Sequence, residues 1–395
     1  MAGNTYKRKK RPIKSTSKLS KYTPKKRSKK SRAKKRKLII IVSIALVIIL
    51  ALSIIPTANN CSKGVKFDRE GHFESGKKIN HELSVKREFE DKILTSCKCG
   101  YEKWDLKGSR SYSIYDGNGF YGKTELAKEK NGSKLVALYD EFYIESNKYL
   151  KSKVDLEFSP IQNKNNLTAE EIKLVFSVFI YENPTFYFLE NSWRATTESG
   201  KTNPLAITLT ACTEYDTVEE RVGVEIALQQ KLDEVYALVK GKNSLLEKGK
   251  AIHDYLLDNL TYADEAAKTG LFSCNSVKKN NWAFCLDGLA TKNRAVCEGY
   301  AKSFLYFSNI FGVEATICTG EGKTNSGNEP HAWNLIKING NWYGLDATWD
   351  DSFAEAKGTK TDYTFFGKGT SFSTDHVSDD FYKKAFTLSS TNLNI

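Results

Sequence analysis

The sequence predicts an α+β fold, in which helices are followed by an antiparallel sheet, preceded by a single membrane-spanning helix. Three observations support this prediction. Capping-box signatures begin three helices, an Asn-Gly pair at 339–340 separates two aromatic, β-branched runs, and an uncharged apolar run fills residues 38–55. Helices followed by paired antiparallel strands are typical of α+β domains.

Residues 1–37 form a basic tail ahead of the apolar run. They hold 18 of the 60 Lys and Arg residues and no acidic residue. As a helix, the 18 residues of the apolar run reach about 27 Å, close to the roughly 30 Å of a bilayer core, and residues 56–58 extend it slightly. Because basic residues flank its amino end, we expect a cytoplasmic tail and an extracellular remainder. The alternative, a cleaved signal peptide, lacks an Ala-x-Ala site after the apolar run.

The chain beyond the tail is mildly acidic, with 42 basic and 47 acidic residues. The net charge of +13 therefore belongs to the tail, and we predict no nucleic-acid partner. Eight cysteines in an extracellular chain suggest disulfides, and Cys274 with Cys285 is the first pair to consider. Cys97 and Cys99 lie too close for half a zinc site, and we predict neither a metal nor a cofactor.

Residues 131–240 show clear periodicity, whereas residues 59–130 are weakly patterned. Apolar residues at helical spacing, Leu135, Leu138 and Phe142 among them, predict a helix. The alternating run LAITLTAC predicts a strand over 205–212. The predicted helices cover 133–150, 168 to the residues before Pro184, 217–240 and 244–259.

The elements after residue 290 are predicted to be a helix, a strand and a hairpin. Val296, Tyr300 and Phe304 form one face of a helix that Gly312 ends. Val313–Thr319 then predicts a strand, and the Gly- and Asn-rich residues 320–328 predict a loop.

The Asn339-Gly340 turn fixes the register of the hairpin. With these two residues as the turn, Ile338 faces Asn341, and Asp346 lies opposite Trp333. His331 is two residues along the same strand, so it shares a face with Asp346 at a diagonal distance of roughly 7–8 Å. A three-residue loop would instead place His331 and Asp346 on opposite faces.

Cys297 stands where a helix begins. The helix amino end favours a thiolate over a thiol, and His331 close by would stabilise it as an ion pair. Asp346, accepting from the other ring nitrogen, would fix the tautomer of the imidazole. A lone Cys, His or Asp is usually structural, so the prediction of a Cys297-His331-Asp346 triad depends on the three together. The backbone N–H of Cys297 is the one oxyanion donor that we can name.

Other residues near the predicted triad have weaker claims. Asp350 or Asp351 could replace Asp346, although Asp350 would share its face only if the strand continued past Trp349. We interpret His253 as structural, because it lies on an amphipathic helix. Four tryptophans could exclude water from the site or simply pack in the core; they are Trp282, Trp333, Trp342 and Trp349.

Three segments resemble the bacterial transglutaminase-like family. They are AVCEGYAKSF (295–304), EPHAWNLIKINGNWYGLDATWDD (329–351) and AIHDYLLDNLTYAD (251–264). The segments ENPTFYFL (182–189) and YTFFGKGTSFSTDH (363–376) fit the family more loosely. The resemblance implies a papain-like core in which a helix carrying Cys297 packs on an antiparallel sheet carrying His331 and Asp346. It also implies that the protein needs no calcium.

We expect a cell-surface cysteine enzyme that acts on amides of proteins or peptides through a thioester. Transamidation and hydrolysis use the same three residues, so the sequence does not separate a transferase from a peptidase. A catalytically silent wall-binding or scaffolding module is the other interpretation, and an intact triad argues against it. The predicted organisation is a tail over 1–37, an anchor over 38–58, an undefined segment over 59–130, an accessory region over 131–240 and a catalytic domain over 241–395.

Overall fold

The structure is a computed structural model that describes five ranges of the chain. They are the strands between residues 72 and 106, given by their backbone, and residues 120–149, 155–269, 280–325 and 327–395. The predicted tail and anchor lie outside the described residues. Among the described residues, no helix is long and apolar enough to cross a membrane. The chain divides into units 1–65 and 66–395, and everything below concerns the second.

The weakly patterned segment contains five short strands that we did not predict. They form one antiparallel pair and one three-stranded antiparallel sheet. The pair is β1 (His72–Glu74) and β2 (Lys77–Ile79), and the sheet is β3 (Ser84–Glu88), β4 (Lys92–Ser96) and β5 (Glu102–Leu106).

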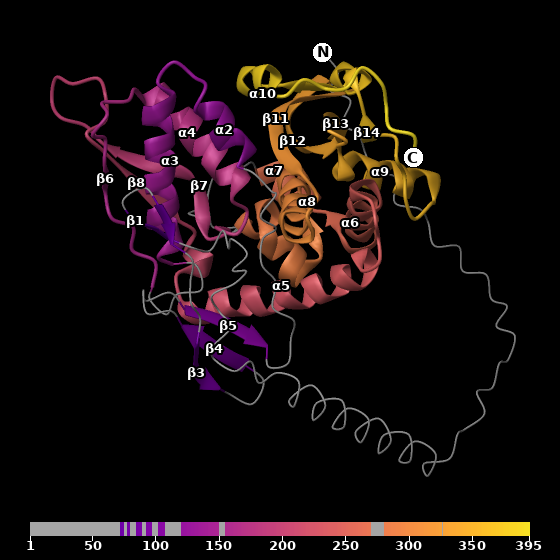
Figure 1. Cartoon of the computed structure of the whole chain (residues 1–395), viewed down its shortest axis with the longest axis horizontal. Helices are drawn as coiled ribbons and strands as arrows, with labels where there is room; N and C mark the ends of the chain where they lie inside the picture. The colour runs from indigo at the N-terminus through magenta and orange to yellow at the C-terminus, as the bar shows by residue number, and fades with distance from the viewer. Residues whose placement is uncertain are drawn as a thin grey trace, which may run out of the picture. The chain divides into compact units, whose positions relative to one another are not determined.

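The accessory region packs helices beside a small sheet (Figure 1). The helices are α2 (Tyr121–Leu126), α3 (Gly132–Asn147) and α4 (Ala169–Glu182), and the sheet has the order β6 (Ile161–Gln162), β8 (Ala206–Ala211), β7 (Leu189–Thr196). A 3-10 turn, η1 (Thr213–Tyr215), leads to the long α5 (Val218–Val239) and then to α6 (Leu245–Asn259). The predicted helices and the predicted strand are thus confirmed, with α3 ending three residues early.

All three predicted capping boxes are present, and each satisfies two backbone N–H groups at a helix start. In every case the Ser or Thr hydroxyl accepts from the Glu backbone N–H, and the Glu carboxylate accepts from the Ser or Thr backbone N–H. The pairs are Thr168 with Glu171, Thr217 with Glu220 and Ser244 with Glu247. Each cap contributes about 1 kcal/mol to helix stability. The helix starts could be predicted because the two residues of a capping box stand at a fixed spacing in the sequence.

The region after residue 241 packs one buried helix, α8 (Cys297–Phe311), against a five-stranded antiparallel sheet. The strand order is β14 (Phe366–Lys368), β13 (Asn341–Leu345), β12 (Gly327–Ile338), β11 (Ala315–Thr324), β15 (His376–Ser378). Gly312 ends α8 in the left-handed conformation (φ 78°). The buried Asn334 amide of β12 donates to the carbonyl oxygen of Ala301 in α8 (3.0 Å), so the helix and the sheet are tied together next to the site.

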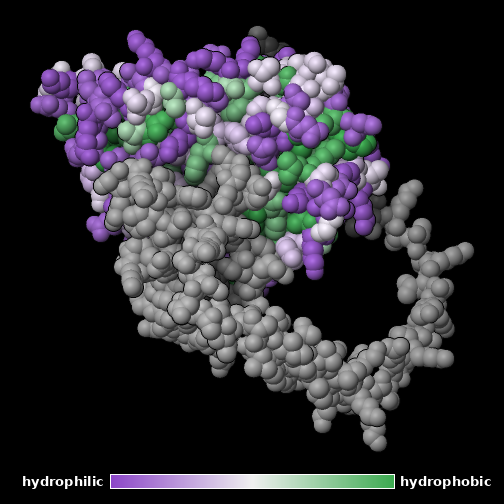
Figure 2. Space-filling model, viewed as in Figure 1, coloured by the Kyte–Doolittle hydropathy of each residue, from purple (hydrophilic) through white to green (hydrophobic). Residues whose placement is uncertain are grey.

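One hydrophobic core runs through both regions. Its fully buried aromatic residues include Phe142 of α3, Phe179 of α4 and Phe304 of α8. Figure 2 shows that hydrophilic residues dominate the visible surface of the described part. The exposed large hydrophobic residues, such as Leu205 and Phe353, are far apart in the sequence, and single exposed hydrophobic residues are normal on a protein surface.

The hairpin turn is formed as predicted. Asn339 (φ 50°) and Gly340 (φ 83°) both adopt positive φ, which the two-residue turn requires. Ile338 pairs with Asn341, and the same register continues to Asn334 opposite Leu345.

The second strand of the hairpin is shorter than predicted. β13 ends at Leu345, and a helix, α9 (Ala347–Lys357), begins immediately after Asp346. The Asp346 carboxylate accepts from the backbone N–H groups of Thr348 and Trp349 (2.9 and 3.2 Å). The prediction of Asp346 within a strand is therefore wrong, because its side chain caps a helix, a position that Asp favours.

The predicted loop over 320–328 is also wrong, because β11 and β12 remain paired as far as Thr324 and Gly327. The glycines mark close packing instead of a loop. A Cβ at Gly320 would lie 2.1 Å from the carbonyl oxygen of Val377 in β15, and one at Gly322 would lie 2.9 Å from the Trp349 ring. Glycine within a strand often marks such a close approach.

The remaining short elements connect these parts. They are β9 (Thr261–Tyr262), α7 (Asp264–Thr269), η2 (Asn281–Phe284), the π-type turn η3 (Gly288–Lys292), β10 (Arg294–Ala295), η4 (Thr370–Thr374) and α10 (Asp380–Ala385).

Candidate active site

Cys297 is the first residue of α8, and its position is fixed by the two residues before it. Ala295, in β10, pairs with Tyr262 of the parallel strand β9. The Val296 N–H then donates to the carbonyl oxygen of Ala283 (2.9 Å), and the extended Val296 backbone is the amino cap of α8. The thiol is free and partly exposed. A sulfur at this helix end receives the favourable field of the unpaired N–H groups.

His331 lies between Cys297 and Asp346. Its Nε2 is 2.7 Å from Asp346 Oδ2, and Cys297 lies near enough for its charge to act on the imidazole. The Trp349 ring stacks on the imidazole at 5.1 Å between centroids. The contact predicted between His331 and Asp346 is therefore present, although Asp346 reaches it from a helix start.

The charge of this group follows from its neighbours. Burial alone would lower the pKa of His331, but the charges of Asp346 and Cys297 and the hydrogen bonds to both outweigh burial and raise it to about 10. Burial alone would raise the pKa of Asp346, but the His331 charge and the hydrogen bonds from His331 and His376 hold it well below its usual range. The pair is therefore an imidazolium and a carboxylate at neutral pH.

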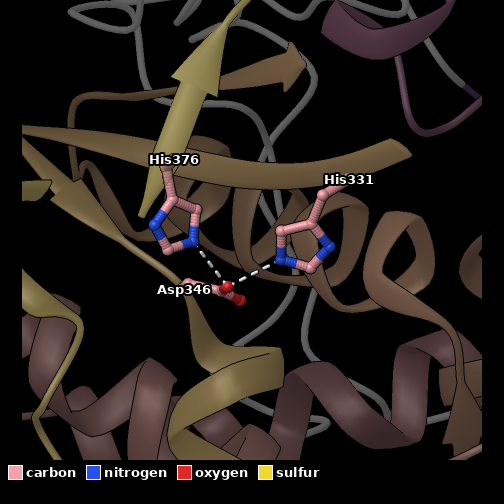
Figure 3. Close-up of side chains that lie close together, drawn as sticks. All are labelled: His331, Asp346 and His376. Carbon is pink, nitrogen blue, oxygen red and sulfur yellow. Dashed lines mark hydrogen bonds and ion pairs between the residues drawn. The ribbon is translucent and has the colours of Figure 1, made fainter. Parts of the chain in front are cut away.

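His376 is a site residue that the sequence did not reveal. It lies on β15, is 1% exposed, and its Nε2 is 2.9 Å from Asp346 Oδ2, the oxygen that His331 also contacts (Figure 3). It stands at the end of the loosely matching segment 363–376, but nothing local indicated its role. β15 reaches the site by pairing with β11, more than fifty residues earlier in the chain.

Tyr262 is a second residue near the site that we did not predict. Burial raises the pKa of its hydroxyl well above the usual range, and the charges of Cys297, Glu329 and Asp264 raise it further. The hydroxyl therefore keeps its proton at neutral pH, and it lies close enough to Cys297 to feel its charge. Tyr262 lies in the segment 251–264, which resembles the family, but the resemblance alone gave Tyr262 no role.

The weaker candidates lie elsewhere. Asp350 is buried on α9 and contacts His253 Nε2 (3.1 Å) and the Phe365 backbone N–H (2.8 Å). The second ring nitrogen of His253 contacts Asp254 (3.1 Å), in agreement with a structural His253. Burial raises the pKa of Asp350 to about 6.

Two of the four tryptophans contact His331. They are Trp349 and Trp333, whose ring centroid is 5.9 Å from that of the imidazole. Trp342 instead packs on Phe386 (5.1 Å), and Trp282 lies beside the Arg294 guanidinium.

Cys274 with Cys285 was the first disulfide pair to consider, and the structure does not form it. Cys285 is a free, buried thiol that lies 3.4 Å from the Tyr215 hydroxyl. Cys318 is also free and buried, whereas Cys212 is disulfide-bonded. The other cysteines, at 61, 97, 99 and 274, lie outside the described residues.

His331, Asp346 and His376 place three potential ligand atoms within 4.8 Å of one another. Hydrogen bonds explain this closeness, because Oδ2 can accept a proton from each Nε2 at 2.7 and 2.9 Å. A metal ion would have to displace both protons, one of them from the imidazolium. We therefore interpret the three residues as a hydrogen-bonded cluster, and the absence of a metal and a cofactor stays a prediction.

Comparison with known proteins gives a family match that includes Cys297, His331 and Asp346. Residues 234–347 match the model of the transglutaminase-like superfamily. Kyphoscoliosis peptidase of Mus musculus and that of Homo sapiens are each 24% identical over 170 residues, which are 40% of this chain and 24% of the relative. The chain thus spans about a quarter of the length of these relatives. A crystal structure of a TGase is similar over 46% of this chain and 48% of that one, with 16% identity and a TM-score of 0.29.

Proposed function

We propose that this chain transfers acyl groups from protein or peptide amides through a thioester on Cys297. Its similarity to the transglutaminase-like superfamily supports this proposal. One observation carries the proposal. His331 is buried with its Nε2 2.7 Å from Asp346 Oδ2, and the charges of Asp346 and Cys297 raise its pKa to about 10. An imidazolium held in this way can supply a proton to a leaving group at neutral pH.

The first half-reaction forms the thioester. The Cys297 thiolate attacks the amide carbonyl carbon, and the electron pair of the C=O bond moves to oxygen. The backbone N–H of Cys297 and the Tyr262 hydroxyl are the donors that we propose for this oxyanion. When the oxyanion collapses, the C–N bond breaks and His331 gives its proton to the departing nitrogen.

The second half-reaction returns the enzyme to its starting state. His331 is now neutral, so it can remove a proton from an incoming amine or water molecule as that molecule attacks the thioester. Cys297 leaves as a thiolate and His331 keeps the proton. An amine gives a new amide, and water gives a carboxylic acid. Trp349 and Trp333 beside His331 limit the access of water on that side.

Hydrolysis is the second candidate function, and one observation favours it. The curated relatives are named peptidases, and the same three residues cleave a peptide bond when water is the acceptor. A silent scaffolding module would not require a charged His331–Asp346 pair, which costs free energy to bury.

Mass spectrometry can separate these functions. We expect the purified full-length chain, given Gln-containing peptides with and without a primary amine, to produce a peptide whose mass has increased by the amine less ammonia. A gain of about 1 Da would indicate deamidation and shorter fragments a peptidase. No change that depends on Cys297, judged against a Cys297→Ala control, would contradict the proposed chemistry and favour the scaffold.

We further propose that residues 38–58 anchor the protein in the cell membrane with its catalytic region outside. The basic flank supports this orientation, and the disulfide at Cys212 is typical of an oxidising compartment. Protein or peptide substrates would then be those of the cell surface.

Protease added to intact cells is expected to digest the region after residue 59 and to leave residues 1–37 intact. Epitope tags at the two ends of the chain, detected by immunoblotting, would show which end is digested and which is protected. A soluble fragment that begins near residue 59 in untreated cultures would instead indicate a cleaved signal peptide.

A further inference from the structure

The Asp346 carboxylate is shared between four donors. Its Oδ1 accepts from two backbone N–H groups at the start of α9, and its Oδ2 faces both His331 Nε2 (2.7 Å) and His376 Nε2 (2.9 Å). Asp346 is 1% exposed. A buried carboxylate must be hydrogen-bonded on both oxygens to remain ionised. His376 is thus a fourth residue at the site, a donor to the carboxylate of the predicted triad.

The surroundings of His376 indicate where its proton lies. Among the described residues its Nδ1 has no hydrogen-bond partner. The ring stacks on Phe372 at 3.9 Å, and Trp349 lies 4.4 Å from it. A proton at Nδ1 would leave a buried donor unsatisfied in an aromatic setting, whereas a proton at Nε2 meets a carboxylate. The geometry therefore places a proton on Nε2, which His376 donates to Asp346.

We propose that His376 is a positioning residue that acts on His331 through Asp346. It holds Oδ2 in place and takes part of the negative charge of this oxygen, so that Asp346 orients the His331 imidazolium without binding its proton too strongly. His331 can then release this proton when a leaving group needs it. This inference rests on the proposed function, because it concerns the acidity of the same imidazole.

The sign of the effect follows from the geometry. When the His376 donor is removed, the charge of Oδ2 is stabilised by one donor fewer, so the carboxylate attracts the His331 proton more strongly. His331 should then become a weaker acid. Other groups act on this pair, and all remain unchanged in the test: Cys297, Tyr262, Asp350 on the same helix as Asp346, and Glu329 and Asp264 beside Tyr262.

A matched pair of variants isolates the donor. His376→Gln keeps an N–H group near the position of Nε2, whereas His376→Met has the same length and no donor. His253→Gln serves as the control, because His253 is equally buried and contacts Asp350 on α9 without touching Asp346. Thermal melting of each full-length variant measures any general loss of stability.

The charge of His331 can be read without a substrate. We would alkylate Cys297 with iodoacetate and with iodoacetamide between pH 7 and 12 and measure the ratio of the two rates. The anionic reagent is favoured while His331 is an imidazolium, and this advantage disappears as the proton is lost. His331→Ala gives the ratio that is expected with no imidazolium.

We expect the midpoint of this ratio to move upward by about one pH unit in His376→Met and to stay near that of the wild type in His376→Gln and His253→Gln. Equal midpoints in all variants, with lower melting temperatures alone, would show that His376 is merely structural and would overturn the inference. If the wild-type ratio does not depend on His331 at all, the proposed function fails and the inference falls with it. The two failures are thus distinguishable.

Discussion

Replacing Asp346 with Asn is expected to lower Cys297-dependent amide transfer by about 10³–10⁴-fold while the chain stays folded. In either orientation, an Asn side chain has one NH₂ group, which must face either the two histidines or the N–H groups of Thr348 and Trp349. If it faces the histidines, Nε2 of His331 loses its acceptor, so the imidazolium is destabilised and the neutral ring carries its proton on Nδ1, the wrong nitrogen for the acid–base role. If it faces Thr348 and Trp349, it removes the cap of α9 and displaces the side chain.

Amine incorporation into Gln-containing peptides measures this loss, and circular dichroism confirms the fold. Asp350→Asn is the matched control, because Asp350 is equally buried on the same helix but contacts His253 and the Phe365 backbone. We expect the control to retain activity within about tenfold of the wild type. Equal losses in both variants would attribute the effect to α9 in general and would remove Asp346 from the triad.

The second large effect concerns thiol selectivity. At neutral pH, iodoacetamide should modify Cys297 far faster than Cys285 or Cys318. Burial and the charge of Asp287 raise the pKa of Cys285 to about 12, so only about one molecule in 10⁵ is a thiolate at pH 7. Burial also raises the pKa of Cys318 well above the ordinary value for a thiol. Cys297 is partly exposed at a helix start beside an imidazolium.

Peptide mapping after brief alkylation measures the three rates in one sample. His331→Ala should slow the modification of Cys297 by about tenfold or more, because the thiolate loses its counter-ion. Cys297→Ala should leave Cys285 and Cys318 unmodified. Rapid labelling of either buried thiol, with Cys297 inert, would remove the main support for Cys297 as the nucleophile.

The features that could be predicted from sequence depend on neighbours a few residues apart. The capping boxes at Thr168, Thr217 and Ser244 join residues three positions apart, and the Asn339-Gly340 turn sets the pairing from Ile338 to Asn334. The contact of His331 with Asp346 followed from this turn. The catalytic roles of Cys297, His331 and Asp346 stay predictions, which the substitutions above test.

The errors arose where a distant segment decides the local structure. Gly320 and Gly322 suggested a loop, but they lie in β11 so that β15 and Trp349 can approach closely. Cys285 is a thiol beside Tyr215, which lies seventy residues earlier. The start of α9 was open to prediction, since Asp346 is a favourable cap and Gly358 a favourable end. His376 was not, because its place depends on the pairing of β15.

The position of β15 near the C-terminus affects when the site can form during synthesis of the chain. The stretch from residue 234 to 347 contains Cys297, His331 and Asp346, but several of the contacts that hold Asp346 come from residues after this stretch. Its backbone N–H donates to Phe365, and its carboxylate needs His376. During synthesis, Cys297 therefore leaves the ribosome some eighty residues before His376, the last donor to Asp346. If Asp346 depends on this donor as proposed, the complete site can form only after β15 has been synthesised.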